Sequence, residues 1–221
     1  MIRTRIDLVV TSGVFSIDGD DFAVDNNVWI IGDDHEAVVV DAAHDATTIA
    51  DAIGDRRLRS IVCTHGHNDH INAAAELARR YGSAPILLHA ADEMLWSMVY
   101  PDRRPDGALA HGGTVEVAGA TLRVLHTPGH SPGGVCLHLP ESSEHDPTLL
   151  TGSHVFGGDT LFNGGPGATG RSFSDFPTII DSIRREILTL PLDTVVHTGH
   201  GDMTRVGDEA PHLDEWIARG H

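Results

Sequence analysis

Residues 64–70 read THGHNDH, a stretch that holds three histidines and one aspartate within six positions. They follow an apolar run that is typical of a buried strand. Because side chains two residues apart in an extended chain point the same way, His65 and His67 can bind one metal ion together. Asp69 and His70 come after the chain turns, so they face a neighbouring position and can bind a second ion. This stretch therefore predicts a metal site in a tight loop at the end of a strand.

Four other segments place a polar side chain at the end of a predicted strand. Asp41 ends the run VVVDA, and His130 lies in the turn TPGHSPGG. Asp159 follows an apolar strand in GGDT, and His200 lies in TGHG. Each residue alone is typical of a turn. Together with residues 64–70 they bring polar side chains to the same mouth of a sheet, which favours a shared site.

Strand and helix patterns alternate along the chain, with strands dominant in the middle. The run at 36–43 is continuously apolar, as expected of a strand buried on both faces. Asp175 and Pro177 suit the cap and first turn of a helix. We expect one domain, residues 1–221, with two sheets faced by outer helices. Helices are predicted at 46–55, 71–82, 90–100, 177–190 and 211–220; strands at 8–17, 27–32, 36–43, 60–63, 85–90, 114–129 (a hairpin turning at 118–120), 133–140, 148–162 and 193–201; a polar turn at 141–147; and a glycine-rich loop at 163–176.

Composition excludes several classes of protein. The 221 residues are 40% hydrophobic, enough for one core. Asp and Glu number 32 against 15 Arg and no Lys, a net charge of −17 that disfavours nucleic acid and anionic membranes as partners. The sequence has no apolar run long enough for a membrane span or a signal peptide, so we expect a cytoplasmic protein. Cys63 and Cys136 form no disulfide framework and fit buried strand positions.

The order of these residues resembles the metal motif of the metallo-β-lactamase superfamily. His-x-His-x-Asp-His is followed by a later His, an Asp and a final His, and the resemblance covers nearly the whole chain. It implies an α/β fold of the αββα sandwich type, with two mixed β-sheets flanked by outer helices. It also implies two Zn²⁺ ions, the first held by His65, His67 and His130, the second by Asp69, His70 and His200, with Asp159 bridging them and Asp41 orienting a ligand histidine by a hydrogen bond.

Within that superfamily the chain is similar to the glyoxalase II group, the hydroxyacylglutathione hydrolases. The supporting phrases are TPGHSPGG, GGDTLF, Gly170-Arg171 and TGHGDMT, and the loop at 163–176 is similar to that of actinobacterial single-domain homologues. The resemblance implies that a hydroxide bridging two metals attacks the carbonyl of a thioester. Asp69 and Asp159 would be the catalytic carboxylates, with Asp69 orienting the hydroxide.

The resemblance also bears on the substrate. Only 21 residues follow His200, so we expect no helical C-terminal glutathione-binding domain of the kind that two-domain members carry. Arg171 matches the loop position where the family places a cation near the thiol carrier. The partner would be a small-molecule thiol conjugate, with the carrier open between glutathione, mycothiol and other thiols. The acyl group and the oligomeric state stay open.

Other activities remain open at this point. A persulfide dioxygenase of the same fold uses one iron held by two His and an Asp, and a His/Asp ligand list does not separate zinc from iron or a mixed Fe/Zn pair. A lactonase, a phosphodiesterase and a non-catalytic metal-binding module are further alternatives. His44, His154 and His197 lie near the proposed mouth and could support ligands by hydrogen bonds, and Asn26 could line the cleft.

Overall fold

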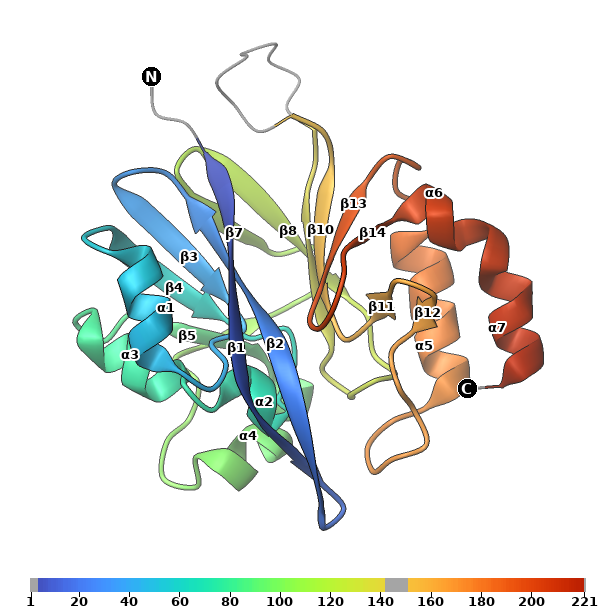
Figure 1. Ribbon diagram of the computed structural model, residues 1–221, viewed down its shortest axis with the longest axis horizontal. Helices are drawn as coiled ribbons and strands as arrows, with labels where there is room; N and C mark the ends of the chain where they lie inside the picture. Colours follow the sequence, from blue (N-terminus) through green and yellow to red (C-terminus); the bar gives the residue numbers. More distant parts are fainter. Residues whose placement is uncertain (1–3, 142–150, 221) are drawn as a thin grey trace.

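The computed structural model describes residues 4–141 and 151–220, which fold into two β-sheets stacked face to face with helices on both outer faces (Figure 1). Both sheets contain parallel and antiparallel neighbours. The predicted fold class, an αββα sandwich with two mixed sheets, is confirmed. None of the described helices is long and apolar enough to cross a membrane.

The first sheet begins with a long antiparallel hairpin and continues in parallel strands. The hairpin pairs antiparallel with the third strand, and the remaining neighbours run parallel. Its spatial order is the sequence order: β1 (Arg5–Ile17), β2 (Asp20–Gly32), β3 (Glu36–Val40), β4 (Arg57–Val62), β5 (Ile86–His89) and β6 (Gly107–Leu109).

The second sheet is mostly antiparallel, with one parallel pair between β10 and β13. A two-stranded ribbon of β11 (Leu161–Phe162) and β12 (Gly165–Pro166) lies beyond it. The spatial order of the second sheet is β14 (Thr204–Arg205), β13 (Val195–Thr198), β10 (His154–Gly158), β9 (Val135–Leu139), β8 (Ala120–His126) and β7 (Thr114–Val117).

Helices cover the outer face of each sheet. Asp45 and Asp175 cap the helices that follow them, because each carboxylate accepts backbone N–H groups of the first turn. The first sheet is covered by α1 (Ala46–Ile53), α2 (Asn68–Ile71), α3 (Ala74–Arg80) and α4 (Glu93–Val99, after a 3₁₀ turn at Ala90–Asp92); the second by α5 (Phe176–Ser182, continued by a π-helical turn at Ile183–Ile187), α6 (Val206–Glu209) and α7 (Leu213–Arg219, after a 3₁₀ turn at Ala210–His212).

The alternation of side chains along β3 explains the layers. Val38 and Val40 belong to the apolar layer between the two sheets, whereas Ala37 and Val39 pack in the layer under α1 and α3. All four residues are fully buried, as predicted for a strand covered on both faces. The second sheet has its own outer layer, in which Val155 packs with residues of α5 and with Trp216 of α7.

Some short elements differ from the prediction. Residues 68–71 form the helical turn α2 rather than a loop, and α3 is correspondingly shorter than the predicted helix at 71–82. The strands β6 and β14 and helix α6 were not predicted, because two to four residues carry no readable period. The predicted turn at 141–147 falls, beyond residue 141, outside the described residues.

Candidate metal centre

Strand ends from both sheets meet at one edge of the sandwich. Asp41 follows β3, His65 lies three residues after β4, and His130 follows β8. Asp159 comes directly after β10, and His200 follows β13. Each of these side chains is buried or nearly so, although charged and imidazole groups are costly to bury without partners. The common mouth that the sequence predicted is therefore present.

Three histidines form one donor group. The ligand nitrogens of His65, His67 and His130 all lie within 4.8 Å of one another. His67 Nδ1 is 3.0 Å from His130 Nε2. All three residues are buried. These distances match what a single tetrahedral ion needs from three imidazoles.

Asp69, His70 and His200 form a second group of the same size. The Nε2 atoms of His70 and His200 are 3.2 Å apart, and His200 Nε2 is 3.3 Å from Asp69 Oδ2. Asp69 and His70 come from the helical turn α2, whose two successive side chains are both buried. The turn therefore places the Asp69 carboxylate and the His70 imidazole in the same donor group.

Asp159 lies between the two groups. Its Oδ1 is 3.3 Å from His70 Nε2 in the second group. Its Oδ2 is 3.5 Å from His130 Nε2 in the first group and 3.5 Å from His200 Nε2 in the second. A Cβ at position 199 would collide with this carboxylate, so the backbone of Gly199 makes room for it. The Asp159 carboxylate therefore contacts ligand atoms of both groups.

Hydrogen bonds on the outer side orient four of the histidines. Each uses Nδ1 to donate to an oxygen, so Nε2 is the nitrogen that faces the centre. The tautomers follow from the acceptors, which are oxygens that bear lone pairs. The pairs are His65 with Thr64 Oγ1 (3.0 Å), His70 with Asp41 Oδ2 (2.9 Å), His130 with the carbonyl of Ala168 (2.8 Å) and His200 with the carbonyl of Asp25 (2.8 Å).

The donor set fits a pair of transition-metal ions. Three buried atoms of the donor set, His65 Nε2, Asp69 Oδ1 and Asp159 Oδ1, have no hydrogen-bond partner. An unpaired buried polar atom is costly, and a cation among these atoms would remove that cost. Imidazole and carboxylate ligands suit zinc and iron alike, so the set selects a class of metal and not one element.

The charges of the centre also favour a cation. Burial alone would lower the pKa of His70, but the carboxylates of Asp69 and Asp159 raise it more. The pKa of His70 therefore lies well above its usual range. The same balance raises the pKa of His200 to about 10. Burial lowers the pKa of His67, on the all-histidine side, to about 3. The carboxylates of Asp69 and Asp159 therefore stabilise positive charge on their side of the centre.

Asp41 is fixed in a strained backbone conformation. Its φ of 58° lies in the left-handed region, which Asp tolerates better than most residues. Its carboxylate accepts hydrogen bonds from Thr64 N (2.7 Å), Thr64 Oγ1 (2.7 Å) and His70 Nδ1. Asp41 also groups with His65 and His70 within 4.8 Å. Because its oxygens already accept these hydrogen bonds, Asp41 holds the His70 ring from outside the second donor group.

A partly buried chain of hydrogen bonds leads to Asp69 through Asn26. Asn72 Nδ2 donates to His44 Nδ1 (3.0 Å), and His44 Nε2 donates to Asn26 Oδ1 (2.8 Å). Asn26 Nδ2 in turn donates to Asp69 Oδ2 (3.0 Å). This chain fixes which oxygen of Asp69 remains unpaired. The suggested supporting position of His44 is therefore present, acting through Asn26.

Asp92, which the sequence did not single out, joins the two loops that carry the first histidine group. Its Oδ2 accepts hydrogen bonds from Gly66 N (2.9 Å) and Ser131 Oγ (2.7 Å), and its Oδ1 accepts one from Gly133 N (2.5 Å). The carboxylate is fully buried. A Cβ at Gly133 would collide with Asp92, so glycine is needed there. The one feature of the sequence that could have indicated this role is that Asp92 is an acidic residue within a predicted helix of apolar character.

Three other predicted positions lie apart from the centre. Arg171 Nη1 is 2.9 Å from Asp20 Oδ2, and its guanidinium stacks on the ring of Phe22 at 5.2 Å. His154 and His197 hydrogen-bond to each other, with 3.0 Å between His154 Nδ1 and His197 Nε2, rather than to a ligand side chain.

Fold and site together define a metal-dependent hydrolase of two-sheet architecture. Residues 22–200 match the family model of the Metallo-beta-lactamase superfamily, and the chain belongs to that family. Hydroxyacylglutathione hydrolase GloC of Haemophilus influenzae is 30% identical over 203 residues, which cover 85% of this chain and 91% of that protein. This similarity confirms the suspected resemblance to the glyoxalase II group.

Solved structures give the same result. The crystal structure of the BLEG-1 B3 metallo-beta-lactamase is 26% identical, with a TM-score of 0.72 and coverage of 92% of this chain and 98% of that one. The structure of TTHA1623 in a di-iron-bound form is 28% identical, with a TM-score of 0.69 and coverage of 85% of this chain and 93% of that one.

Proposed function

We propose that this protein hydrolyses the thioester of a small thiol in a centre that holds two metal ions. The observation that carries the proposal is the position of Asp159 between two separate donor groups, each of three side chains. The similarity to a hydroxyacylglutathione hydrolase over most of both chains supports thioesters as the substrate class.

The proposed ligands follow the two groups. His65, His67 and His130 would hold the first ion; Asp69, His70 and His200 would hold the second, with Asp159 shared between them. Zinc is the proposed metal. Iron or a mixed pair is compatible with the same donors, and a similar protein has been solved with two irons. When bound, such ions lower the pKa of a water molecule and polarise a carbonyl oxygen.

The residues of the chain supply orientation. Asp69 Oδ1 is buried and unpaired, so it can accept a hydrogen bond from the attacking water and hold its lone pair toward the carbonyl carbon. Asn26 keeps Asp69 in that rotamer by binding the other oxygen. Asp41 and Thr64 hold the rings of His70 and His65 in place. The sulfur leaves as a thiolate, which needs no strong general acid.

The test is thiol release by zinc-loaded protein from S-lactoylglutathione and from the S-lactoyl ester of N-acetylcysteamine, followed with a chromogenic thiol reagent. Turnover of either ester at an ordinary enzyme rate, on the order of 1 s⁻¹ or more, supports the proposal. A protein with two bound zinc ions that releases no thiol from either ester would contradict it. Oxygen consumption with a persulfide by iron-loaded protein, without thiol release, would instead identify the dioxygenase alternative.

A further inference from the structure

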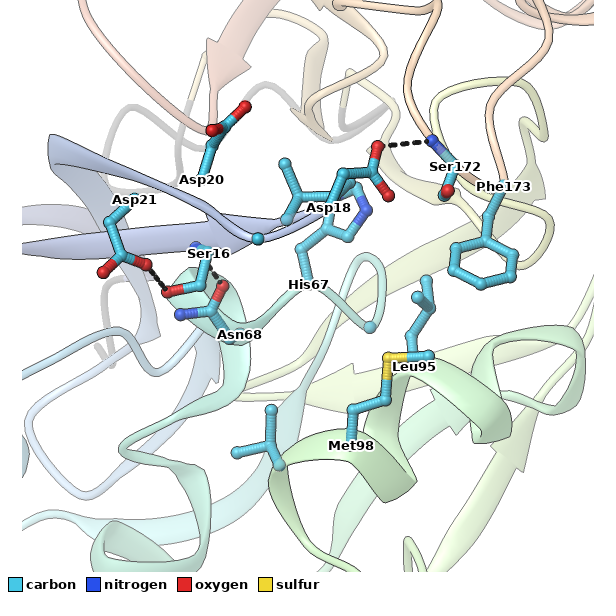
Figure 2. Close-up of a pocket in the computed structure, with 14 residues that line it drawn as sticks. Ser16, Asp18, Asp20, Asp21, His67, Asn68, Leu95, Met98, Ser172 and Phe173 are labelled. Carbon is cyan, nitrogen blue, oxygen red and sulfur yellow. Dashed lines mark hydrogen bonds between the residues drawn. The ribbon is translucent and has the colours of Figure 1, made fainter.

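A groove of about 440 Å³ opens beside the first histidine group (Figure 2). One wall is the tip of the β1–β2 hairpin, residues 16–21, and the opposite wall is α4. Figure 2 shows His67 between the hairpin residue Asp18 and the helix residue Leu95. His67 is only 6% exposed, and its Nε2 has no hydrogen-bond partner. The groove therefore reaches one residue of the candidate metal centre, His67.

The α4 side of the groove is apolar. Leu95, Met98 and Val99 line it, and Met98 is 63% exposed. Phe173 lines the groove from the 163–176 loop, with its ring toward Leu95 in Figure 2. Phe173 has a φ of 70° and is 42% exposed, although a bulky side chain rarely adopts that backbone conformation. Strain that exposes an apolar ring is typical of a binding site rather than of a packed loop.

The hairpin side of the groove is acidic. Asp18, Asp20 and Asp21 all line it. Hydrogen bonding from Ser172 lowers the pKa of Asp18, so this carboxylate is charged at neutral pH. Asp21 accepts a hydrogen bond from Ser16 Oγ (2.7 Å), which leaves its charge in place. The same wall thus carries three carboxylates.

The nearest arginine, Arg171, offsets these charges only in part, although its charge also helps to lower the pKa of Asp18. Arg171 is paired with Asp20 at 2.9 Å and covered on one face by Phe22, so one carboxylate and one cation cancel. Of the residues described, no arginine lines the groove, and the sequence contains no lysine. The net charge facing a ligand is negative, in a chain that is already strongly acidic.

We propose that this groove binds the carrier portion of the thioester and selects a carrier without net negative charge, an inference that rests on the thioesterase proposed above. The groove is larger than a small acyl group needs, whereas the longer carrier thiol would fill it. Its alkyl part would pack on Leu95, Met98 and Phe173, and a cationic or hydroxyl group would face Asp18 and Asp21. Glutathione, with two carboxylates and one ammonium, is repelled.

The experiment compares three acetyl thioesters that differ in the charge of the carrier. S-Acetylglutathione is anionic, S-acetyl-N-acetylcysteamine is neutral, and acetylthiocholine is cationic. Zinc-loaded protein is expected to hydrolyse the neutral and cationic esters with a kcat/KM about 3- to 10-fold or more above that of the glutathione ester. The ratio should shrink as ionic strength is raised, because salt screens exposed charges.

Charge-neutral variants test the assigned residues. Asp18 has a φ of 54°, a conformation that Asn tolerates well, so Asp18→Asn preserves the turn and the Ser172 contact. The double variant Asp18→Asn, Asp21→Asn should raise kcat/KM for S-acetylglutathione and lower it for acetylthiocholine, each by about 3- to 10-fold. The neutral ester should change by less than about 2-fold. Asp214→Asn on α7 is the matched control and should leave all three esters unchanged.

A third variant frees Arg171. Asp20→Asn removes the partner of the guanidinium, so a cation becomes available at the groove rim and the glutathione ester should improve further. Thioester hydrolysis with equal or greater kcat/KM for the glutathione ester would overturn the groove assignment while leaving the thioesterase intact. A change of the same size for all three esters in the double variant would also overturn it. Absence of hydrolysis of every ester by zinc-loaded protein would instead contradict the proposed function.

Discussion

The Asp92 carboxylate accepts a hydrogen bond from the backbone NH of Gly66, with 2.9 Å between Asp92 Oδ2 and Gly66 N. Gly66 is the residue between the two histidines of the THGHNDH stretch. The same carboxylate also binds Ser131 and Gly133, the neighbours of His130. One buried side chain from the turn before α4 therefore sets the spacing of all three histidines in the first donor group.

Replacing this carboxylate should weaken metal binding. In Asp92→Asn, the NH2 group of the amide replaces one carboxylate oxygen, so it faces an N–H or O–H group that has lost its acceptor. The free energy of unfolding should fall by about 2–3 kcal/mol. Zinc affinity, measured by competition with a chromogenic chelator, should fall about 10- to 100-fold because the histidine loops lose their common anchor. Asp106→Asn, at a partly exposed carboxylate, is the control. Unchanged zinc affinity in a folded Asp92→Asn protein would contradict this positioning role.

Asp159→Ala should cost both metal and turnover. Without its carboxylate the two donor groups lose their shared side chain, so the purified variant should retain less than two metal equivalents. Thiol release should fall by on the order of 100-fold or more. Metal content by elemental analysis and initial rates check the two effects separately, with Asp193→Asn on an exposed turn as the control. A wild-type rate with one bound metal would show that Asp159 does not bridge.

Much of this centre was predictable because its chemistry is local in the sequence. His65, His67 and Asp69 fall within one short stretch, and strand ends of a two-sheet fold must meet at the same edge. Asp92 was not predictable, because its partners lie 26 to 41 positions away and a single acidic residue carries no period. The pairing of Arg171 with Asp20 joins residues 151 positions apart.

Local propensity also limited the fold prediction. Residues 20–26 of β2 read DDFAVDN. Their acidic side chains are not typical of a strand, and they form one because they pair with β1 in the hairpin. The core strand β3 was readable, since four consecutive apolar residues between turn signals have few alternatives. The four-residue helix α2 exists because its side chains are buried in the site, which is a tertiary effect.

His197 should make the fold sensitive to acid. Burial, together with the neighbouring His154, lowers its pKa to about 3. The unfolded chain takes up a proton near the ordinary pKa of 6.5, so stability is full above that pH and falls as the pH drops toward 3. At about pH 5 the loss from this group is about 2 kcal/mol.

The variant His197→Gln keeps a donor for His154 but does not titrate. Urea unfolding of metal-free wild type and variant, at about pH 7.5 and about pH 5, measures the difference in acid sensitivity. The wild type should lose about 2 kcal/mol more than the variant between the two pH values. His212→Gln, at an exposed histidine, should behave as wild type. Equal acid sensitivity of wild type and His197→Gln would refute the assignment.

Both cysteines should be inert in the folded protein. Cys63 and Cys136 are fully buried, and burial raises the pKa of the Cys136 thiol to about 11 and that of Cys63 well above its usual range. Because the thiolate is the reactive form, Ellman's reagent at about pH 8 should detect no thiol before denaturation and both thiols after it. Rapid reaction of the native protein would contradict the burial. An inert protein also leaves the thiol-release assay free of background.

The central claim is that this protein hydrolyses a thioester and needs two metal ions, which the donor groups that share Asp159 would hold. It is tested most directly by titrating zinc into metal-free protein while following thiol release from S-acetyl-N-acetylcysteamine. The account predicts that the rate reaches its full value only when two zinc ions are bound per chain. Full activity with a single bound zinc, or no thiol release with both sites filled, would contradict it.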